Sequence, residues 1–364
     1  MANNFCRFLS NGYRLVTNGY TLSWSPCCWW TNPIDVDSPN FAQEKERISK
    51  ITDWVPECNC RRLEESGVQN LAPRIRSFRD IPDENLPDHV PGWVELSIDT
   101  TCNAACLMCG DYHSTLWRKQ NIKYGLKRID DLPDLVDPMH WLDRIKRDFP
   151  LDHITSTHIL GGEPFQTNIT YEYLKYIKDL KGLQDLSVTI STNGSSRPAP
   201  ELVELLQECK IVRYLFSLDC TDEQFEYIRY PLKWSRVEDV VKHINSLPGN
   251  KMMNITCTVN PLNMFYYDRL EQWVKSLEPE VKFGNVVPNR CVGELNLAWM
   301  PIPLREMLKK KYGPDHKVTK MLSNLDFWPD NSHMMRYIET WDAHRKTNWR
   351  ETFPDVVKYF DLNI

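Results

Sequence analysis

Short apolar runs that alternate with segments of helical periodicity place the strongest constraint on the fold of this chain. Between two of the runs, Leu202, Leu205, Leu206 and Cys209 recur at the i, i+3, i+4, i+7 spacing of one helix face. Strands that alternate with helices predict parallel β/α units joined by right-handed crossovers. Six units predict an α/β fold that forms a partial, TIM-like (β/α)6 barrel and not a closed barrel of eight. The six predicted strands are 93–99, 154–160, 186–191, 211–218, 253–259 and 281–287.

The sequence before the first predicted strand has a different composition. Residues 1–78 are rich in Cys, Trp, Asn and Arg and show little sustained periodicity. We therefore expect a Cys-rich metal-binding module that is organised by a metal and not by a large hydrophobic core. Residues 79–92 contain three prolines and several acidic residues, which predicts an extended linker. The barrel then spans 93–290, and residues 291–364 predict a C-terminal extension of two or three helices that closes one end of the barrel.

Charge and apolar content exclude several classes of partner. The net charge of −5 creates no field that would draw the whole protein to nucleic acid or to an anionic membrane surface. No apolar stretch has the length of a signal peptide or of a membrane span, so we expect a soluble, cytoplasmic protein. In that compartment, clustered thiols indicate metal binding or catalysis and not disulfides. Eight of the 12 cysteines lie within the first 109 residues, whereas Cys209, Cys220, Cys257 and Cys291 are scattered and are expected to be small buried residues.

Unusual polar sequences follow the predicted strands. The first strand is followed by CNAACLMC (102–109), and the second by Gly161-Gly162-Glu163-Pro164. Ser191-Thr192-Asn193-Gly194 ends the third, Asp219-Cys220 the fourth, and Asn260-Pro261 the fifth. Because the carboxyl ends of parallel barrel strands meet at one mouth, these sequences predict one shared site.

The spacing of Cys102, Cys106 and Cys109 is C-x3-C-x2-C. Three thiolates can ligate three irons of a four-iron four-sulfur cluster and leave the fourth iron open to a ligand. A closed zinc site is the alternative, because His113 extends the pattern to four soft ligands. No Gly-x-Gly-x-x-Gly follows the first strand, which argues against a dinucleotide site.

Together, CNAACLMC and GGEP resemble the radical S-adenosylmethionine superfamily. The resemblance implies that Cys102, Cys106 and Cys109 bind the cluster and that the GGEP loop holds the methionine amino group of the cofactor. A diglycine lets a backbone approach a ligand closely, and Glu163 offers an anionic acceptor for an ammonium. By the same resemblance, the strand ends STNG and SLD contact the ribose and carboxylate of the cofactor. The implied cofactor-binding residues are Gly161, Gly162, Glu163, Pro164, Asn193, Ser217 and Asp219, and Asn260 is a weaker candidate.

EYIRYPLKW (226–234) and the order of the N-terminal cysteines resemble radical S-adenosylmethionine proteins with a twitch or SPASM-like auxiliary module, many of them from phages and environmental bacteria. This resemblance includes a Cys pair followed by Glu64-Glu65-Ser66-Gly67, and it implies a second iron–sulfur cluster. Cys58 and Cys60 are only two residues apart, where C-x2-C is expected, so a zinc site or a smaller cluster is the alternative. The implied ligands are Cys6, Cys27 or its neighbour Cys28, Cys58 and Cys60.

A further departure from these relatives is Cys220, where they tend to have glycine. At the barrel mouth this thiol either donates a hydrogen atom, as a catalytic residue, or fills space, and the second interpretation is favoured.

The resemblance implies an enzyme that cleaves S-adenosylmethionine reductively and abstracts hydrogen from a substrate through a 5′-deoxyadenosyl radical. It also implies a reductant such as flavodoxin or ferredoxin. Peptide or protein modification is the commonest theme among relatives with such modules. Two alternatives stay open at this point, namely an enzyme that modifies a nucleotide or tRNA, and a non-catalytic interaction protein that binds zinc. The charge of the chain makes nucleic acid the less favoured partner.

Overall fold

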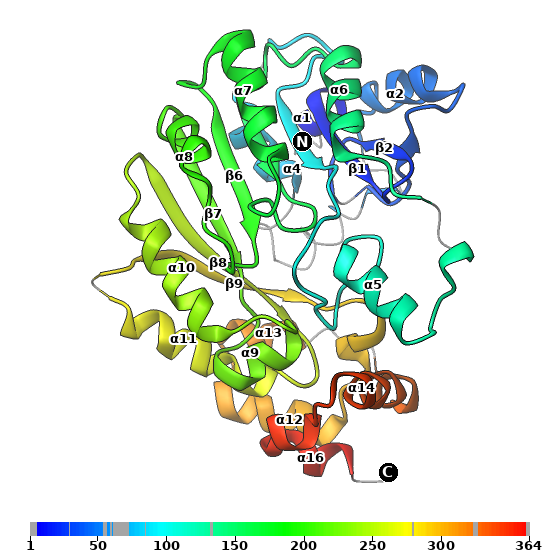
Figure 1. Ribbon diagram of the computed structural model, residues 1–364, viewed down its shortest axis with the longest axis vertical. Helices are drawn as coiled ribbons and strands as arrows, with labels where there is room; N and C mark the ends of the chain where they lie inside the picture. The colour runs from blue at the N-terminus through cyan, green and yellow to red at the C-terminus, as the bar shows by residue number, and fades with distance from the viewer. Residues whose placement is uncertain are drawn as a thin grey trace.

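The computed structural model describes residues 6–28, 30–53, 57–58, 60, 73–83, 85–131, 134–278, 280–322 and 327–361. In this part of the chain one nine-stranded sheet has the order β3-β2-β1-β4-β5-β6-β7-β8-β9 (Figure 1). Its edges are β3 and β9, so the sheet stays open, as the count of six units predicted. None of the helices in the described ranges is long and apolar enough to cross a membrane.

All six predicted strands are confirmed, and they lie side by side in chain order. Each pairs in parallel with the next, as Trp93↔Ser156 and Ser156↔Ser187 illustrate at one end of the sheet. This order is what successive right-handed β/α crossovers produce. The strands are β4 (Trp93–Ser97), β5 (Ser156–Ile159), β6 (Ser187–Thr192), β7 (Ile211–Ser217), β8 (Lys251–Val259) and β9 (Phe283–Arg290).

The crossover helices cover one face of the sheet (Figure 1). They bury the apolar faces that periodicity predicted, and Cys209, two residues beyond the end of its helix, is buried as well. Along β6 and β7, buried residues alternate with half-buried ones, which leaves a more polar second face. The helices are α6 (Pro138–Asp148), α7 (Ile169–Lys181), α8 (Pro200–Gln207), α10 (Trp234–Ser246) and α11 (Tyr267–Ser276).

The N-terminal segment extends the same sheet, which differs from our expectation for residues 1–78. β1 (Gly12–Thr17) pairs in parallel with β4, and β2 (Leu22–Ser25) and β3 (Ile34–Asp35) follow as antiparallel strands. The expectation that a metal replaces a hydrophobic core here is wrong for the described residues, because Tyr13 and Leu15 are fully buried. The sequence did not predict these strands because the segment around them shows little sustained periodicity. The helices of this segment are α1 (Arg7–Asn11), α2 (Phe41–Ser49) and α4 (Pro73–Asp80).

The predicted linker is held against this N-terminal segment. The Tyr13 hydroxyl donates to the carbonyl of His89 at 2.5 Å, and the Asn11 amide donates to Pro87 and Val90 carbonyls at 2.8 Å. These contacts hold residues 87–90 of the predicted linker against the end of α1 and the start of β1. The domain boundaries at 78 and 92 stay a prediction.

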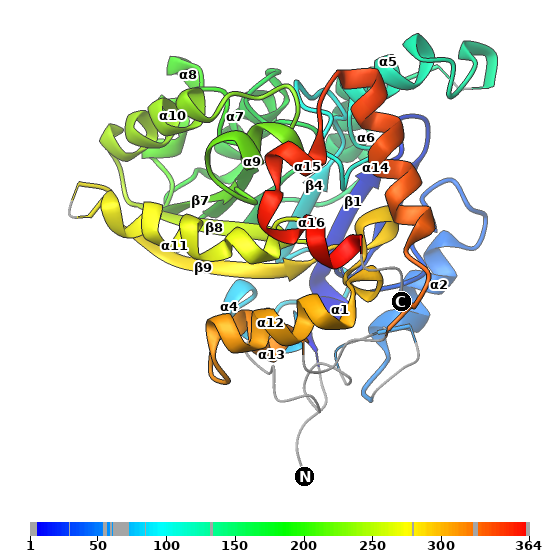
Figure 2. The same cartoon turned by 90° about the horizontal axis from the view of Figure 1, so that it is seen from below.

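The C-terminal extension contains five α-helices in the described ranges, where two or three helices were expected. Prolines, Gly313 with φ +78° and Lys346 in the left-handed region divide it into shorter elements. α12, α14 and α16 lie together at one end of the molecule (Figure 1), and Figure 2 shows α14, α15 and α16 across the sheet from that side. The helices are α12 (Ile302–Tyr312), α13 (Lys317–Leu322), α14 (Ser332–Arg345), α15 (Trp349–Thr352) and α16 (Pro354–Phe360).

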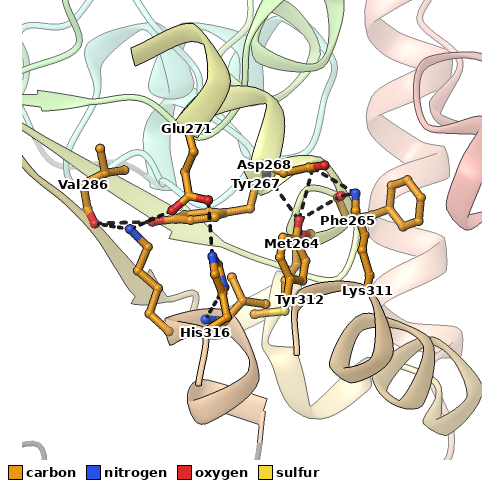
Figure 3. A network of polar contacts seen from close by, with 11 residues as sticks. Met264, Phe265, Tyr267, Asp268, Glu271, Val286, Lys311, Tyr312 and His316 are labelled. Carbon is orange, nitrogen blue, oxygen red and sulfur yellow. Dashed lines mark hydrogen bonds and ion pairs between the residues drawn. The ribbon is translucent and has the colours of Figure 1, made fainter. Parts of the chain in front are cut away.

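A network of polar contacts fixes α12 and α13 to the region around α11 (Figure 3). The Tyr312 hydroxyl donates to the carbonyl of Met264 at 2.9 Å and accepts from the backbone N–H of Asp268 at 3.3 Å. Lys311 pairs with the Asp268 carboxylate at 2.9 Å. On α13, the ammonium of Lys317 pairs with Glu271 at 3.0 Å. The extension is therefore tied to the loop that follows β8.

Replacement of Tyr312 by phenylalanine tests this junction. The variant keeps the ring but leaves the Met264 carbonyl and the Asp268 N–H without this partner, so the free energy of unfolding should fall by about 1 to 2 kcal/mol. Urea denaturation measures the change. Tyr171→Phe, on α7 and far along the chain from the junction, is the matched control and should change stability less.

Candidate functional site

The three-cysteine loop lies between β4 and α5 (Thr115–Lys123), at the carboxyl end of the first barrel strand. Its backbone pairs with the segment after α9 (Asp222–Ile228), because Ala105 N–H donates to Tyr230 at 2.7 Å and Leu107 N–H to Ile228 at 2.9 Å. On the other side, the Trp117 indole donates to the Cys106 carbonyl at 2.8 Å. The loop is therefore held by contacts on both sides before any ligand binds.

Helix α14 covers this loop from the C-terminal extension. The Tyr337 hydroxyl donates to the Leu107 carbonyl at 2.7 Å, and the Arg345 guanidinium donates to the Ala105 carbonyl at 2.8 Å. Arg345 is itself buried, with its guanidinium over the rings of Trp117 and Trp341. The extension therefore contacts the loop at the carboxyl end of β4, and the closure of one end of the barrel stays a prediction.

Among the three cysteines of the loop, Cys106 is buried, whereas Cys102 and Cys109 are half-buried. Burial and, to a smaller extent, the neighbouring charge of Cys106 together raise the pKa of Cys102 and of Cys109 to about 12. The pKa of Cys106, which is only 8% exposed, is raised by burial as well. Because burial disfavours the thiolate form of all three side chains, bound iron would supply positive charge that favours it.

The GGEP loop packs directly on the residues that precede Cys102. Gly162 N–H donates to the Asp99 carbonyl at 2.7 Å, and Glu163 N–H donates to the Thr101 carbonyl at 2.8 Å. Gly161 has φ +137°, and a Cβ on Gly162 would lie 2.0 Å from the Thr101 oxygen. The diglycine therefore serves the close approach of two loops, where the sequence suggested the approach of a ligand.

Gly162→Ala should separate these two loops. The added Cβ meets backbone, which cannot rotate away, so we expect a loss of about 3 kcal/mol in the free energy of unfolding. Gly110→Ala is the matched control, because a Cβ at Gly110 meets no heavy atom within 4 Å. Equal denaturation midpoints for the two variants would contradict the proposed close contact.

Glu163 lies at the centre of the candidate site and is 2% exposed. Its carboxylate accepts from the Thr192 hydroxyl and from the Asn193 N–H, both at 2.7 Å. Burial raises the pKa of Glu163 to about 7, even though these hydrogen bonds oppose the shift. The third strand end thus binds the loop that follows the second, as convergence at one mouth predicted.

Asn193 connects Glu163 to the three-cysteine loop. Its amide donates to the Asn103 side chain at 3.0 Å and approaches the Cys102 sulfur at 4.0 Å. Asn103 in turn donates to the Ser195 hydroxyl at 2.9 Å. The structure therefore brings together Cys102, Glu163 and Asn193, and it adds Asn103 and Ser195, which sequence reasoning missed although Asn103 lies inside the cysteine motif.

The fourth strand end is arranged differently. The Asp219 side chain is fully buried, and one carboxylate oxygen lies 2.7 Å from the Arg229 guanidinium while the other accepts from Thr258 N–H at 2.7 Å. Ser217 is half-buried where β7 ends and lies beside Thr256 of β8. Asp219 thus pairs with a protein cation, whereas the sequence predicted contact with the cofactor.

Cys220 and Asn260 also follow strands, but both are fully buried. Burial raises the pKa of Cys220 well above its ordinary value, which favours the space-filling interpretation of this thiol. Asn260 is engaged locally, because its side-chain oxygen accepts from Leu262 N–H at 2.9 Å.

The N-terminal cysteines differ in exposure. Cys6, Cys27 and Cys60 are buried, Cys58 is half-buried and Cys28 is exposed. Burial raises the pKa of Cys6 to about 11, and the charge of nearby Cys58 adds to the shift. The Glu64-Glu65-Ser66-Gly67 motif lies outside the described residues. Within the described ranges, no three His, Cys, Asp or Glu side chains lie close enough together to hold a single metal ion.

A hydrogen-bonded chain on the second face of the sheet was also missed. Glu95 lies 2.7 Å from Arg14 and 3.2 Å from one ring nitrogen of His158, whose other ring nitrogen lies 2.8 Å from the Ser191 hydroxyl. Burial alone would raise the pKa of Glu95, but His158 and the arginines lower it to about 2. The chain crosses four neighbouring strands and ends one residue before Thr192.

An open parallel barrel with a three-thiol loop and a buried carboxylate at its carboxyl edge has the form of an α/β enzyme domain. Residues 96–272 match the family model of the Radical SAM superfamily. This segment is thus a domain of the radical S-adenosylmethionine superfamily, whose members are enzymes that use a four-iron four-sulfur cluster and S-adenosylmethionine. The matched segment contains the cysteine loop, GGEP, STNG and the Asp219–Arg229 pair.

Several solved structures are similar to this chain. SuiB of Streptococcus suis bound to S-adenosylmethionine is 14% identical with a TM-score of 0.39, and the match covers 86% of this chain and 62% of SuiB. Histidine-tagged anSMEcpe with bound AdoMet is 16% identical with a TM-score of 0.40, and the match covers 60% of this chain and 59% of anSMEcpe. This chain thus spans about three fifths of those proteins. No curated protein matches the sequence.

Proposed function

We propose that this chain cleaves S-adenosylmethionine reductively and uses the resulting radical to abstract hydrogen from a substrate. The observation that carries the proposal is the convergence of the Cys102 thiol, the Glu163 carboxylate and the Asn193 amide at one edge of the sheet. All three lie in the segment that matches the superfamily. Cys102 and Asn193 are 91 positions apart in the sequence, so their proximity depends on the fold and not on one loop.

The donor atoms present fit a cluster. Cys102, Cys106 and Cys109 would hold it, and none of them is in a disulfide. When bound, the cluster supplies one electron to S-adenosylmethionine, which gives methionine and a 5′-deoxyadenosyl radical. The loop contacts and α14 would keep water from this chemistry, since Cys106 is only 8% exposed.

The cofactor would be held by the GGEP loop and by Asn193. Glu163 would accept a hydrogen bond from the methionine ammonium, because its buried carboxylate lies beside the cysteine loop, whereas Asp219 is already paired with Arg229. Ser217, at the end of β7, would contact the ribose or carboxylate. Asp219 would act through Arg229, because its carboxylate is already paired.

We further propose a second iron–sulfur cluster held by Cys6, Cys58, Cys60 and either Cys27 or Cys28. Support comes from the proximity of Cys6 to Cys58 and from the position of Cys27 and Cys28 beside Arg76 of α4. The substrate class that we propose is a peptide or protein, because peptide or protein modification is the commonest theme among relatives with such modules. SuiB, for comparison, has been solved bound to its precursor peptide SuiA.

Anaerobic reconstitution of the full chain tests the proposal. Iron and sulfide are counted, and 5′-deoxyadenosine is measured by chromatography after addition of S-adenosylmethionine and dithionite. Formation of 5′-deoxyadenosine, with more iron than one four-iron cluster contains, is the expected result. Bound zinc without cofactor cleavage would overturn the proposal and favour the interaction protein that binds zinc.

A further inference from the structure

A buried arginine contacts one of the three candidate cluster ligands. The Arg229 guanidinium donates to the Cys106 sulfur at 3.7 Å, across 123 positions of sequence. The same guanidinium lies 2.7 Å from the Asp219 carboxylate. The side chain of Arg229 is 9% exposed and that of Asp219 is fully buried. The Arg229 guanidinium, whose burial costs free energy, therefore lies next to the Cys106 sulfur.

The backbone fixes this arrangement from both directions. Arg229 directly follows α9, and its N–H donates to Phe225 at 2.8 Å. Its neighbours Ile228 and Tyr230 accept hydrogen bonds from the cysteine loop at Leu107 and Ala105. Backbone hydrogen bonds between the cysteine loop and the residues on either side of Arg229 therefore fix the position of its backbone beside Cys106.

Cys102 and Cys106 are treated differently by the protein. The Cys102 sulfur receives hydrogen bonds from neutral donors, which are the Ala104 N–H at 3.4 Å and the Asn193 amide at 4.0 Å. The Cys106 sulfur receives one from a cation. A hydrogen bond from a charged donor stabilises negative charge on its acceptor more strongly than one from a neutral donor.

We infer that Arg229, oriented and partly neutralised by Asp219, is a positioning residue that sets the reduction potential of the cluster through the Cys106 sulfur. The inference rests on the proposed function. Reduction adds one negative charge to the cluster, and charge and hydrogen bonds at the ligand sulfurs determine how strongly that charge is stabilised. The positive charge of Arg229 raises the reduction potential of the cluster. The negative charge of Asp219, which is paired with Arg229, limits this increase.

Two single substitutions should shift the potential in opposite directions. Arg229→Gln removes the cation next to the sulfur and leaves the Asp219 anion, so the cluster should become harder to reduce. Asp219→Asn leaves the cation without its counter-charge, so the cluster should become easier to reduce. A merely structural ion pair would not give opposite signs, because either substitution breaks the same pair.

The measurement is a redox titration followed by electron paramagnetic resonance on full chains reconstituted to equal iron content. The cluster is identified by the change in its spectrum on addition of S-adenosylmethionine. Arg128→Gln is the control, because the Arg128 side chain is 80% exposed. The cluster of this variant should have the reduction potential of the wild-type cluster. If Arg229→Gln loses the cluster, the double variant Arg229→Gln/Asp219→Asn, which buries no unpaired charge, should titrate below Asp219→Asn.

The outcomes separate this inference from the proposed function. Opposite shifts of Arg229→Gln and Asp219→Asn, or a double variant below Asp219→Asn, support the inference. Equal potentials in all variants that retain the cluster, or shifts of one sign, overturn it while the proposed function stands. A wild-type chain whose spectrum does not respond to S-adenosylmethionine overturns both.

Discussion

Cys106→Ala is expected to reduce the formation of 5′-deoxyadenosine to background, because it removes one of three thiols that would hold the cluster. The loss should be complete, since no electron reaches S-adenosylmethionine without the cluster. Cys106 is also the ligand best shielded from water, at 8% exposure, so solvent would not readily substitute for the missing sulfur. Chromatography of the reaction after reconstitution measures the product, and the iron count should fall by about one cluster.

Cys209→Ala is the matched control for this experiment. Cys209 is similarly buried, at 5% exposure, but it lies after α8 at the opposite end of its β/α unit from the candidate site. It should keep the iron content and most of the activity of the wild type. Product formation by Cys106→Ala at a rate close to that of Cys209→Ala would contradict the assigned ligand set.

The barrel was predictable because its signals are local. Each of the six strands is an apolar run long enough to recognise, and parallel pairing then places the residues that follow each strand at one edge. The contact between Glu163 and Asn193 follows from this rule. β1, β2 and β3 were missed because they lie in a Cys- and Trp-rich segment that lacks the alternation of apolar runs with helical segments that marked the six barrel strands.

The parts that depend on tertiary pairing were beyond local patterns. Arg229 lies within the segment EYIRYPLKW, and nothing in the sequence of that segment points to Cys106. Asp219 sits where a cofactor contact was expected, but a buried carboxylate takes the nearest available cation, which is Arg229. The role of Gly162 in loop packing likewise depends on Thr101, which is distant in the chain.

Glu163→Gln should stabilise the protein without S-adenosylmethionine and at the same time weaken binding of that cofactor. Burial raises the pKa of Glu163 from 4.5 to about 7. Glu163 therefore holds its proton more tightly in the folded state than in the unfolded state. The free energy of unfolding of the wild type should fall as the pH rises from about 4.5 to 7, and it should stay low above pH 7. Glutamine carries no charge, so the variant should gain up to about 3 kcal/mol over the wild type at pH 8 and little at pH 4.5.

Cofactor affinity should change in the opposite direction. The charge-assisted hydrogen bond to the methionine ammonium is lost in Glu163→Gln, so the dissociation constant for S-adenosylmethionine should rise by roughly 10- to 100-fold at pH 8. Urea denaturation at the two pH values and equilibrium binding to reconstituted protein measure the two effects. Glu306→Gln, on the exposed side of α12, should show neither.

The two effects have one cause. The buried carboxylate at the centre of the site destabilises the fold when it is ionised and has no cation beside it, and the ammonium of the cofactor would supply that cation. Binding should therefore lower the pKa of Glu163 and release a proton near pH 7, which calorimetry in buffers of different ionisation enthalpy detects for the wild type. Lower stability of Glu163→Gln at pH 8, together with unchanged affinity, would instead make Glu163 a structural link between two strand ends.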